Sequence, residues 1–204
     1  MKLFILFLFF QTFLFAQEKK ANDILVMGNY SSICLSDSGF AFTDSLPQLL
    51  SDFQLIMLFS TSTSKLSESD IERLTDYVEN GGGLYAGADN WPFQSESNQI
   101  TRRLYKKESY GNFEVQNAEG VAAGNLQLEE IDSIPAGKST VAFPMDYRLQ
   151  VEAWIEDQPL ILTGRMGKGR IVIDGGYSRF YCDFKNQESE VMLLKILDFL
   201  NGED

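Results

Sequence analysis

Eight polar or aromatic residues stand where binding chemistry is most readily expected, just after apolar segments typical of buried strands. They offer hydroxyl, amide, carboxylate, guanidinium and aromatic groups, a mixture that suits a polar neutral ligand or a peptide segment. Strands of an α/β sheet bind ligands beyond their carboxyl ends, so we expect these residues to lie together. They are Tyr30, Ser31, Thr61, Asp89, Asn90, Trp91, Tyr177 and Arg179.

Acid–base catalysis has few candidate groups in this sequence. The 204 residues include no histidine, so neither a Ser-His nor a Cys-His pair can be built within the chain. Asp89 and Asp174 are the acids that could form a catalytic pair. For Asp89 a structural role is the stronger interpretation, because an aspartate before Asn90 and a Trp-Pro pair favours a turn. Arg179 either binds a ligand carboxylate or pairs with a structural acid, for which Asp89 is the candidate.

Motifs for a metal or a phosphate-bearing cofactor are not found in the sequence, and we expect no cofactor. Two distant cysteines without histidine do not make a zinc site, and the acids lack EF-hand spacing. Residues 167–170, Gly-Lys-Gly-Arg, lack the spacing of a phosphate loop. Gly81-Gly82-Gly83 precedes a strand instead of opening a helix, so it is not a dinucleotide fingerprint. Calcium binding by carboxylates stays open.

Alternating strands and helices position the eight residues. Strands are expected at 23–28, 54–60, 84–88, 159–163 and 170–174, and helices at 43–52, 67–80, 97–107 and 188–200. This order predicts an α/β fold, a three-layer sandwich with a flavodoxin-like, mostly parallel sheet and a late antiparallel hairpin. Residues 113–157 break the pattern with short alternating segments, which favours an irregular insertion with small strands.

The N-terminus has the layout of a secretory signal peptide over residues 1–16. Lys2 precedes an apolar stretch over 3–15, and Ala16 precedes a polar segment. The stretch is shorter than the ~20 residues that a bilayer crossing needs. We expect residues 17–22 to be a short linker and 23–204 to be one exported domain, periplasmic or secreted, without a membrane span after signal removal. Retention of the segment as an anchor is the alternative.

Charge and cysteine content narrow the possible partners. A net charge of −12 argues against nucleic acid, because phosphate binding needs clustered basic residues. Cys34 and Cys182 follow the first and the last predicted strand, and export would permit a disulfide between them. Two separate, small apolar side chains are an equally good interpretation.

Two segments resemble class I glutamine amidotransferase-like domains, including their trehalose-utilisation (ThuA-like) branch. Residues 74–84, Leu-Thr-Asp-Tyr-Val-Glu-Asn-Gly-Gly-Gly-Leu, are similar to the helix-to-strand joint of those domains. Residues 167–176, Gly-Lys-Gly-Arg-Ile-Val-Ile-Asp-Gly-Gly, resemble their late hairpin. Active members carry a cysteine nucleophile on the turn after the strand that follows the helix-to-strand joint. They also carry a His-Glu pair later in the chain. Here Tyr85-Ala86-Gly87-Ala88 holds no cysteine, so the resemblance implies the fold and not glutaminase activity.

The sequence leaves three functions open. The first is an exported, non-catalytic amidotransferase-like domain that binds a polar small molecule or a protein partner at the carboxyl ends of its strands. The second is a carboxylate- or metal-dependent hydrolase of carbohydrate or peptide in the cell envelope. The third is a structural component of an envelope assembly.

Overall fold

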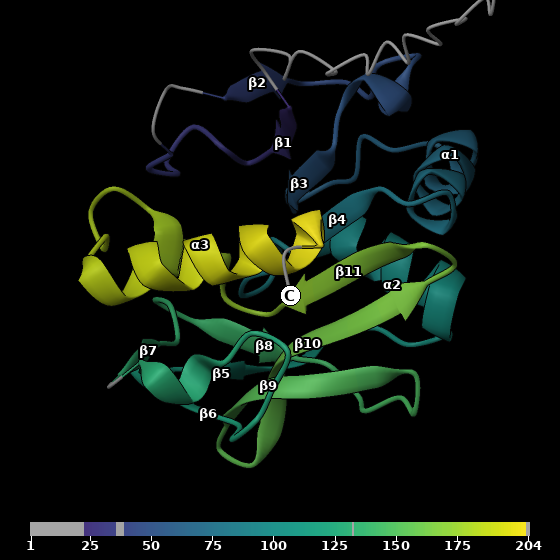
Figure 1. Cartoon of the computed structure of the whole chain (residues 1–204). Coiled ribbons are helices and arrows are strands. Elements are labelled where there is room, and N and C mark those ends of the chain that lie inside the picture. The colour runs from purple at the N-terminus through teal and green to yellow at the C-terminus, as the bar shows by residue number, and fades with distance from the viewer. Residues whose placement is uncertain (1–22, 36–38, 132, 203–204) are drawn as a thin grey trace, which may run out of the picture.

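A nine-stranded mixed sheet forms the centre of the molecule (Figure 1). The structure is a computed structural model that describes residues 23–35, 39–131 and 133–202. From edge to edge the strands are β2 (Phe40–Thr43), β1 (Ile24–Gly28), β3 (Leu55–Phe59), β4 (Gly83–Gly87), β11 (Gly169–Asp174), β10 (Gln158–Met166), β9 (Leu149–Ile155), β6 (Asn117–Gly120) and β7 (Ile134–Pro135). A separate two-stranded sheet pairs β5 (Tyr110–Phe113) with β8 (Thr140–Ala142).

The sheet has a parallel half and an antiparallel half. The neighbours β2, β1, β3, β4 and β11 run parallel. Beyond β11, each pair from β10 to β7 is antiparallel. The parallel half has the flavodoxin-like order, because the second strand of the chain lies at the edge and the first lies inside it. The predicted α/β fold, with a mostly parallel sheet and a late antiparallel hairpin, is therefore confirmed.

Helices cover both faces of the sheet (Figure 1). On one face, α1 (Glu68–Glu79) and α2 (Ser95–Tyr105) bury Leu74 and Ile100 against strand residues such as Leu84. On the other face, α3 (Gln187–Asn201) buries Ile196 in a core that includes Met57. Side chains alternate between the two faces of a strand, so each face of the parallel half builds its own core. These layers form the predicted three-layer sandwich.

Local signals in the sequence set both ends of α1. Ser67 Oγ accepts a hydrogen bond from the Asp70 N–H at 3.2 Å, and the Asp70 carboxylate accepts one from the Ser67 N–H at 3.0 Å. This capping box confirms the predicted start. The helix ends at Asn80, and Gly81 has a φ of +121°, a conformation that glycine adopts without strain. The chain can therefore reverse and enter β4 within a few residues.

The helix expected at 43–52 is wrong. Its first residue belongs to edge strand β2, and a 3₁₀ turn, η1 (Leu50–Asp52), follows later. Pro47 lacks the N–H that a helix interior uses. Thr43 Oγ1 donates to the Ser45 carbonyl oxygen at 2.9 Å and accepts from the Ser45 N–H at 3.3 Å, which closes a local turn instead. The apolar residues that suggested a helix therefore lie in an irregular segment and in the 3₁₀ turn that follows it.

The expected insertion contains small strands, and some of these belong to the main sheet. Strands β6, β7 and β9 continue the main sheet, whereas β5 and β8 form their own pair, and η2 (Leu128–Glu130) is a 3₁₀ turn. The insertion thus extends the sheet past the hairpin of β10 and β11. It also supplies a wall beside the carboxyl end of the parallel strands.

The expected signal peptide, 1–16, and linker, 17–22, lie outside the described residues. Within the part of the chain that the structure describes, no helix has the length and the apolar character needed to cross a membrane.

Candidate functional site

The loops after β4 and β11 meet at the carboxyl end of the sheet. These strands are neighbours in the sheet. Asp89 follows β4, and Asp174 is the last residue of β11. The Ala88 N–H donates to the Asp174 carbonyl oxygen at 2.6 Å, and the Tyr177 N–H donates to the Ala88 carbonyl oxygen at 3.2 Å. The chain after β11 then forms a 3₁₀ turn, η3 (Tyr177–Phe180). Backbone bonds thus hold both loops together at the edge where α/β sheets bind ligands.

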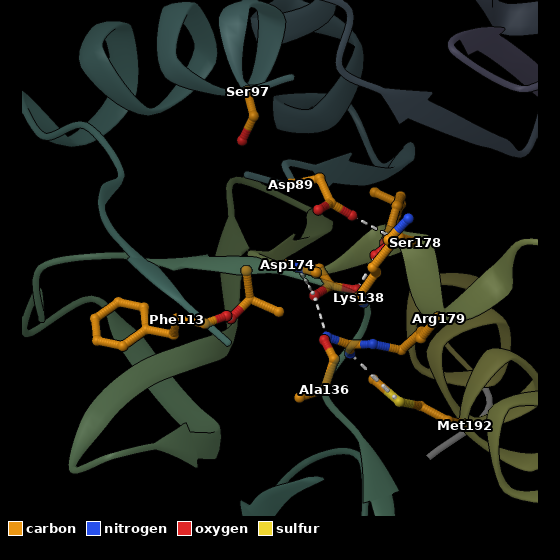
Figure 2. A network of polar contacts seen from close by, with 12 residues as sticks. Asp89, Ser97, Phe113, Ala136, Lys138, Asp174, Ser178, Arg179 and Met192 are labelled. Carbon is orange, nitrogen blue, oxygen red and sulfur yellow. Dashed lines mark hydrogen bonds and ion pairs between the residues drawn. The ribbon is translucent and has the colours of Figure 1, made fainter. Parts of the chain in front are cut away.

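Arg179 and Asp174 form an ion pair in the interior. Both side chains are fully buried, and Arg179 Nη2 lies 3.1 Å from Asp174 Oδ1. The same Nη2 donates to the Ala136 carbonyl oxygen at 2.8 Å, and Nη1 contacts Met192 Sδ at 3.5 Å (Figure 2). The expected pairing of Arg179 with Asp89 is therefore wrong. Because η3 folds the chain back after Gly176, the guanidinium returns to the end of its own strand.

Both oxygens of the Asp174 carboxylate have partners inside the protein. Oδ1 also accepts the Gly176 N–H at 3.0 Å, and Oδ2 accepts the Tyr85 hydroxyl at 2.7 Å. Burial, and then the negative charge of Asp174, raise the pKa of Tyr85 well above its usual range, so this hydroxyl stays a donor. A buried charge needs such partners to offset its lost hydration. Asp174 therefore belongs to the framework of the site.

Asp89 is buried on one side and faces a cavity on the other. Its residue exposure is 2%, and its oxygens accept the Asn90 N–H at 2.8 Å and the Ser178 N–H at 2.7 Å. Figure 2 shows the carboxylate directed at Ser178. Burial raises the pKa of Asp89 to about 6, against the lowering effect of those hydrogen bonds and of Arg179. The turn role expected for this carboxylate is confirmed, and its charge also responds to pH near neutrality.

A cavity of about 620 Å³ opens above Asp89. The wall opposite the strands comes from the β5–β8 pair, where Ser139 Oγ donates to Asn112 Oδ1 at 2.7 Å. Ser178 joins the two sides, because its Oγ accepts the Lys138 N–H at 2.9 Å. The lining residues are Asp89, Asn90, Phe93, Asn112, Glu114, Lys138, Ser139, Ser178 and Tyr181.

A second cavity of about 460 Å³ continues the first one toward the start of α3. The two cavities share Glu114 and Lys138 as lining residues. The second adds, among others, Gln116, Pro135, Phe184, Asn186 and Glu188. We call the two together the tip groove. Its mixed lining of acids, amides, one lysine, one arginine and aromatic rings suits a polar ligand.

Five of the residues proposed from the sequence lie in or next to this groove. Arg179 lines the second cavity, although its guanidinium is paired with Asp174. Asp89 and Asn90 line it, and Trp91 follows on the same turn with 75% of its surface exposed. Tyr177 is buried close to Asp89, and its hydroxyl donates to the Ser60 carbonyl oxygen at 2.7 Å. Tyr177 thus supports the β4 loop from below.

The other three lie elsewhere. The Thr61 hydroxyl and N–H each donate to buried Glu96 at 2.7 Å. Tyr30 packs its ring on Phe42 at 5.2 Å, toward the β2 edge. Ser31 is exposed on the loop after β1. The predicted residues therefore share the carboxyl end of the sheet, but they do not all lie at the tip groove.

Many of the groove residues that sequence reasoning missed come from the insertion or lie next to it, although Phe93, Tyr181 and Phe184 were missed too. Asn112, Glu114, Lys138 and Ser139 reach the groove through the pairing of β5 with β8. That pairing joins segments almost 30 positions apart, and no local motif marks it. The one local sign is Gly137, whose φ of +114° and close approach to Ser178 Oγ suit only glycine.

Metal ligation has little support in the described residues. They contain no group of three or more Cys, Asp or Glu side chains that could hold a metal ion. Glu96 and Glu152 are buried acids, but both accept backbone N–H groups of nearby loops. These acids therefore act as internal caps.

Comparisons with known proteins establish the fold and no more. No protein-family model matches the sequence, and neither does any curated protein. Solved structures do match. A cytoplasmic protein from Salmonella typhimurium is similar with a TM-score of 0.60 and 13% identity, over 87% of this chain and 98% of that one.

Two further solved structures with similar folds are described as proteins of different kinds. A ThuA-like protein from Bacteroides uniformis has a TM-score of 0.58 and 12% identity, over 93% of this chain and 96% of that one. A GH42 β-galactosidase from G. stearothermophilus matches with a TM-score of 0.56 and 13% identity, over 87% of this chain but 29% of the enzyme. At these identities a shared architecture carries no activity with it. The chain has a ThuA-like α/β fold.

Proposed function

We propose that this chain is a non-catalytic, amidotransferase-like binding domain that holds a neutral, hydroxyl-rich ligand in the tip groove. One observation carries the proposal. Asp89 is buried, each of its oxygens accepts one backbone N–H, and it lines a cavity of about 620 Å³ with amide, hydroxyl and lysine groups around it. Such convergent polar groups in a concave site orient a ligand.

Charge in the groove favours a neutral ligand. Asp89 and Glu114 oppose Lys138 in the first cavity, so a strongly charged molecule would meet repulsion from one of them. Hydroxyl groups can donate to the acids and accept from the lysine and amides. Phe93 and Tyr181 add apolar faces in the same cavity. A short oligosaccharide has this combination of hydroxyls and apolar ring faces.

Absence of catalysis is supported by the sequence and by the engagement of Asp174. The sequence has no histidine, and Tyr85-Ala86-Gly87-Ala88 stands where related enzymes carry their nucleophile. Asp174 is committed to Arg179 and Tyr85. The signal-like residues 1–16 support the further proposal that the domain works outside the cytoplasm, in the periplasm or secreted.

Titration calorimetry with uncharged oligosaccharides of graded length would test the proposal. We expect binding that weakens at least tenfold in Glu114→Gln, which replaces a charged acceptor by a neutral amide, and in Asn112→Ala, which removes an amide. Glu72→Gln is the matched control, since Glu72 is an exposed acid on α1. Equal affinity in all three variants, or selective binding of a protein segment in place of the sugars, would overturn the proposal.

A hydrolase is the second candidate, and one observation favours it. Burial raises the pKa of Asp89 to about 6, a value suited to a general acid, and Glu114 lines the same cavity. Turnover of chromogenic glycosides or peptides that is lost in Asp89→Asn would establish this function in place of simple binding.

A further inference from the structure

The loop after β1 pairs with the segment that follows η3. Ile33 and Tyr181 form an isolated antiparallel bridge. On either side of it, the Cys34 N–H donates to the Phe180 carbonyl oxygen at 2.8 Å, and the Cys182 N–H donates to the Ser32 carbonyl oxygen at 2.9 Å. Two segments almost 150 positions apart in the chain therefore form a minimal two-stranded ladder.

This ladder brings the two cysteines to one side. Side chains alternate along a strand, so Cys34 and Cys182 both leave the ladder on the face opposite Ile33 and Tyr181. They are diagonal neighbours across the pair, close enough for one side chain to reach the other. The Cys34 thiol is near enough to be the main cause of the raised pKa of Cys182.

Both thiols are reduced in the structure and open to reagents. Cys182 is exposed and Cys34 is half-buried. Because the ladder joins two loops and has a single bridged pair, its backbone can shift to reach disulfide geometry without breaking the main sheet. The exposed position also allows a disulfide-bearing oxidant to approach Cys182.

Tyr181 links this cysteine pair to the tip groove. It sits directly before Cys182 and lines the first cavity. Its ring contacts those of Tyr177, at 6.0 Å between centroids, and Phe184, at 6.4 Å. Phe184 lines the second cavity. A constraint at residue 182 therefore acts on the aromatic side of both cavities.

We propose that Cys34 and Cys182 form a reversible disulfide that fastens the β1 loop to the aromatic wall of the tip groove. The bond forms by thiol–disulfide exchange with a small-molecule disulfide such as oxidised glutathione. The Cys182 thiolate attacks the donor and releases one thiol, and the Cys34 thiolate then attacks the Cys182 sulfur and releases the second. Two protein thiols are oxidised and one donor disulfide is reduced.

Formation of the bond is tested without any ligand. The purified full chain is equilibrated in oxidised or reduced glutathione, and peptide mapping and thiol labelling follow. We expect a 34–182 crosslinked peptide, loss of both labels, and a Tm about 5–10 °C higher than in the reduced protein. Cys34→Ser and Cys182→Ser should each retain one reactive thiol and lose the Tm shift. Two labelled thiols under oxidising conditions, or a crosslink between molecules instead, would overturn the proposal.

The effect on the groove rests on the proposed function and is measured separately. We expect oligosaccharide affinity to differ at least threefold between the oxidised and reduced protein, and to be independent of redox state in Cys34→Ser. A disulfide that forms while affinity stays equal would contradict the link to the groove and leave ligand binding intact. Failure of every sugar to bind would contradict the proposed function, while the crosslink and Tm data would still decide the disulfide.

Discussion

Asp174 ends β11 and Asp89 follows the neighbouring strand β4, yet the two acids have very different surroundings. Asp174 lies under the surface with Arg179, Tyr85 and the Gly176 N–H around its two oxygens. Asp89 has backbone N–H groups on one side and a cavity of about 620 Å³ on the other. Both acids are almost completely shielded from solvent. Burial alone therefore does not separate a framework acid from a ligand-facing one.

The difference lies in how each charge is compensated. Asp174 has a full counter-charge 3.1 Å away, which offsets much of the cost of burying it. Asp89 has neutral donors as its nearest partners, and these offset its burial only in part, so burial raises its pKa to about 6. An acid that keeps unfilled acceptor capacity toward a cavity is available to a ligand. An acid whose partners are all internal holds the loops in place.

Removing the counter-charge of Asp174 should produce the largest effect. Arg179→Met leaves a buried carboxylate without its cation, and we expect a loss of roughly 3–5 kcal/mol of unfolding free energy. Urea denaturation measures it. The double variant Arg179→Met with Asp174→Leu should recover part of the loss, because no charge then remains buried.

A surface ion pair is the control for that variant. Arg102 and Glu108 are 2.7 Å apart with exposed fractions of 59% and 48%, and Arg102→Met should cost less than about 1 kcal/mol. Similar losses in Arg102→Met and Arg179→Met would remove the distinction between framework and surface charges.

The second prediction concerns the pH dependence of stability through Asp89. Its pKa is about 6 in the folded state and 3.8 as a reference value, so between these values the folded protein binds more protons than the unfolded one. Stability from this group is thus full below about pH 4 and falls as pH rises through about 6, by roughly 3 kcal/mol in total. The unfolding free energy of the native protein minus that of Asp89→Asn should decrease over this range.

Asp146 supplies a control of opposite sign. A hydrogen bond from Arg148 lowers the pKa of Asp146 to about 2, so its stabilising contribution is present above about pH 4 and is lost as pH falls toward 2. The difference between native protein and Asp146→Asn should therefore increase with pH. Parallel trends for the two aspartates would show that Asp89 is not held at a raised pKa.

Much of the parallel half could be predicted because its signals are local. Ser67 with Asp70 marks a helix start, Gly81 marks a helix end, and apolar runs mark the buried strands. The helix expected at 43–52 failed because its apolar spacing suits more than one structure, and Pro47 and the turn at Thr43 decide between them. Elements whose ends are defined by nearby residues are therefore predicted well from the sequence.

The site was only half predictable, for a different reason. Asp89 and Asn90 follow a strand directly, so their place at the sheet edge could be inferred from the sequence. Glu114 and Lys138 reach the same cavity through the pairing of β5 with β8. The partner of Arg179 likewise depends on how η3 turns. Long-range pairing and side-chain direction are tertiary properties, and a single sequence does not state them.

The third prediction compares two tyrosine hydroxyls, one beside Asp174 in the core and one at the tip groove. Tyr85→Phe removes the hydroxyl that donates to Asp174 at 2.7 Å in the core, and a hydrogen bond to a buried charge is worth about 1.5–3 kcal/mol. Tyr181→Phe removes a hydroxyl at the groove that accepts from Asn29 at 3.4 Å, and we expect less than about 1 kcal/mol. Thermal unfolding of both variants measures the contrast. A larger loss of unfolding free energy in Tyr181→Phe than in Tyr85→Phe would show that the groove residues near Asp89, and not those around Asp174, stabilise the fold.

The smallest effect on stability is expected at Trp91, on the turn beside Asn90. With 75% of its surface exposed, Trp91→Ala should change the unfolding free energy by no more than about 0.5 kcal/mol. An indole that contributes so little to the fold can instead offer its face to a ligand ring, so we expect the same variant to weaken oligosaccharide binding about fivefold, or ~1 kcal/mol. Tyr147→Ala is the matched control, because Tyr147 is 95% exposed and lies outside the tip groove. If Trp91→Ala and Tyr147→Ala bind the oligosaccharide with equal affinity, Trp91 does not contact the ligand. If Trp91→Ala loses more unfolding free energy than Tyr85→Phe, Trp91 stabilises the fold, and the loop after β4 does not separate framework residues from ligand-facing ones.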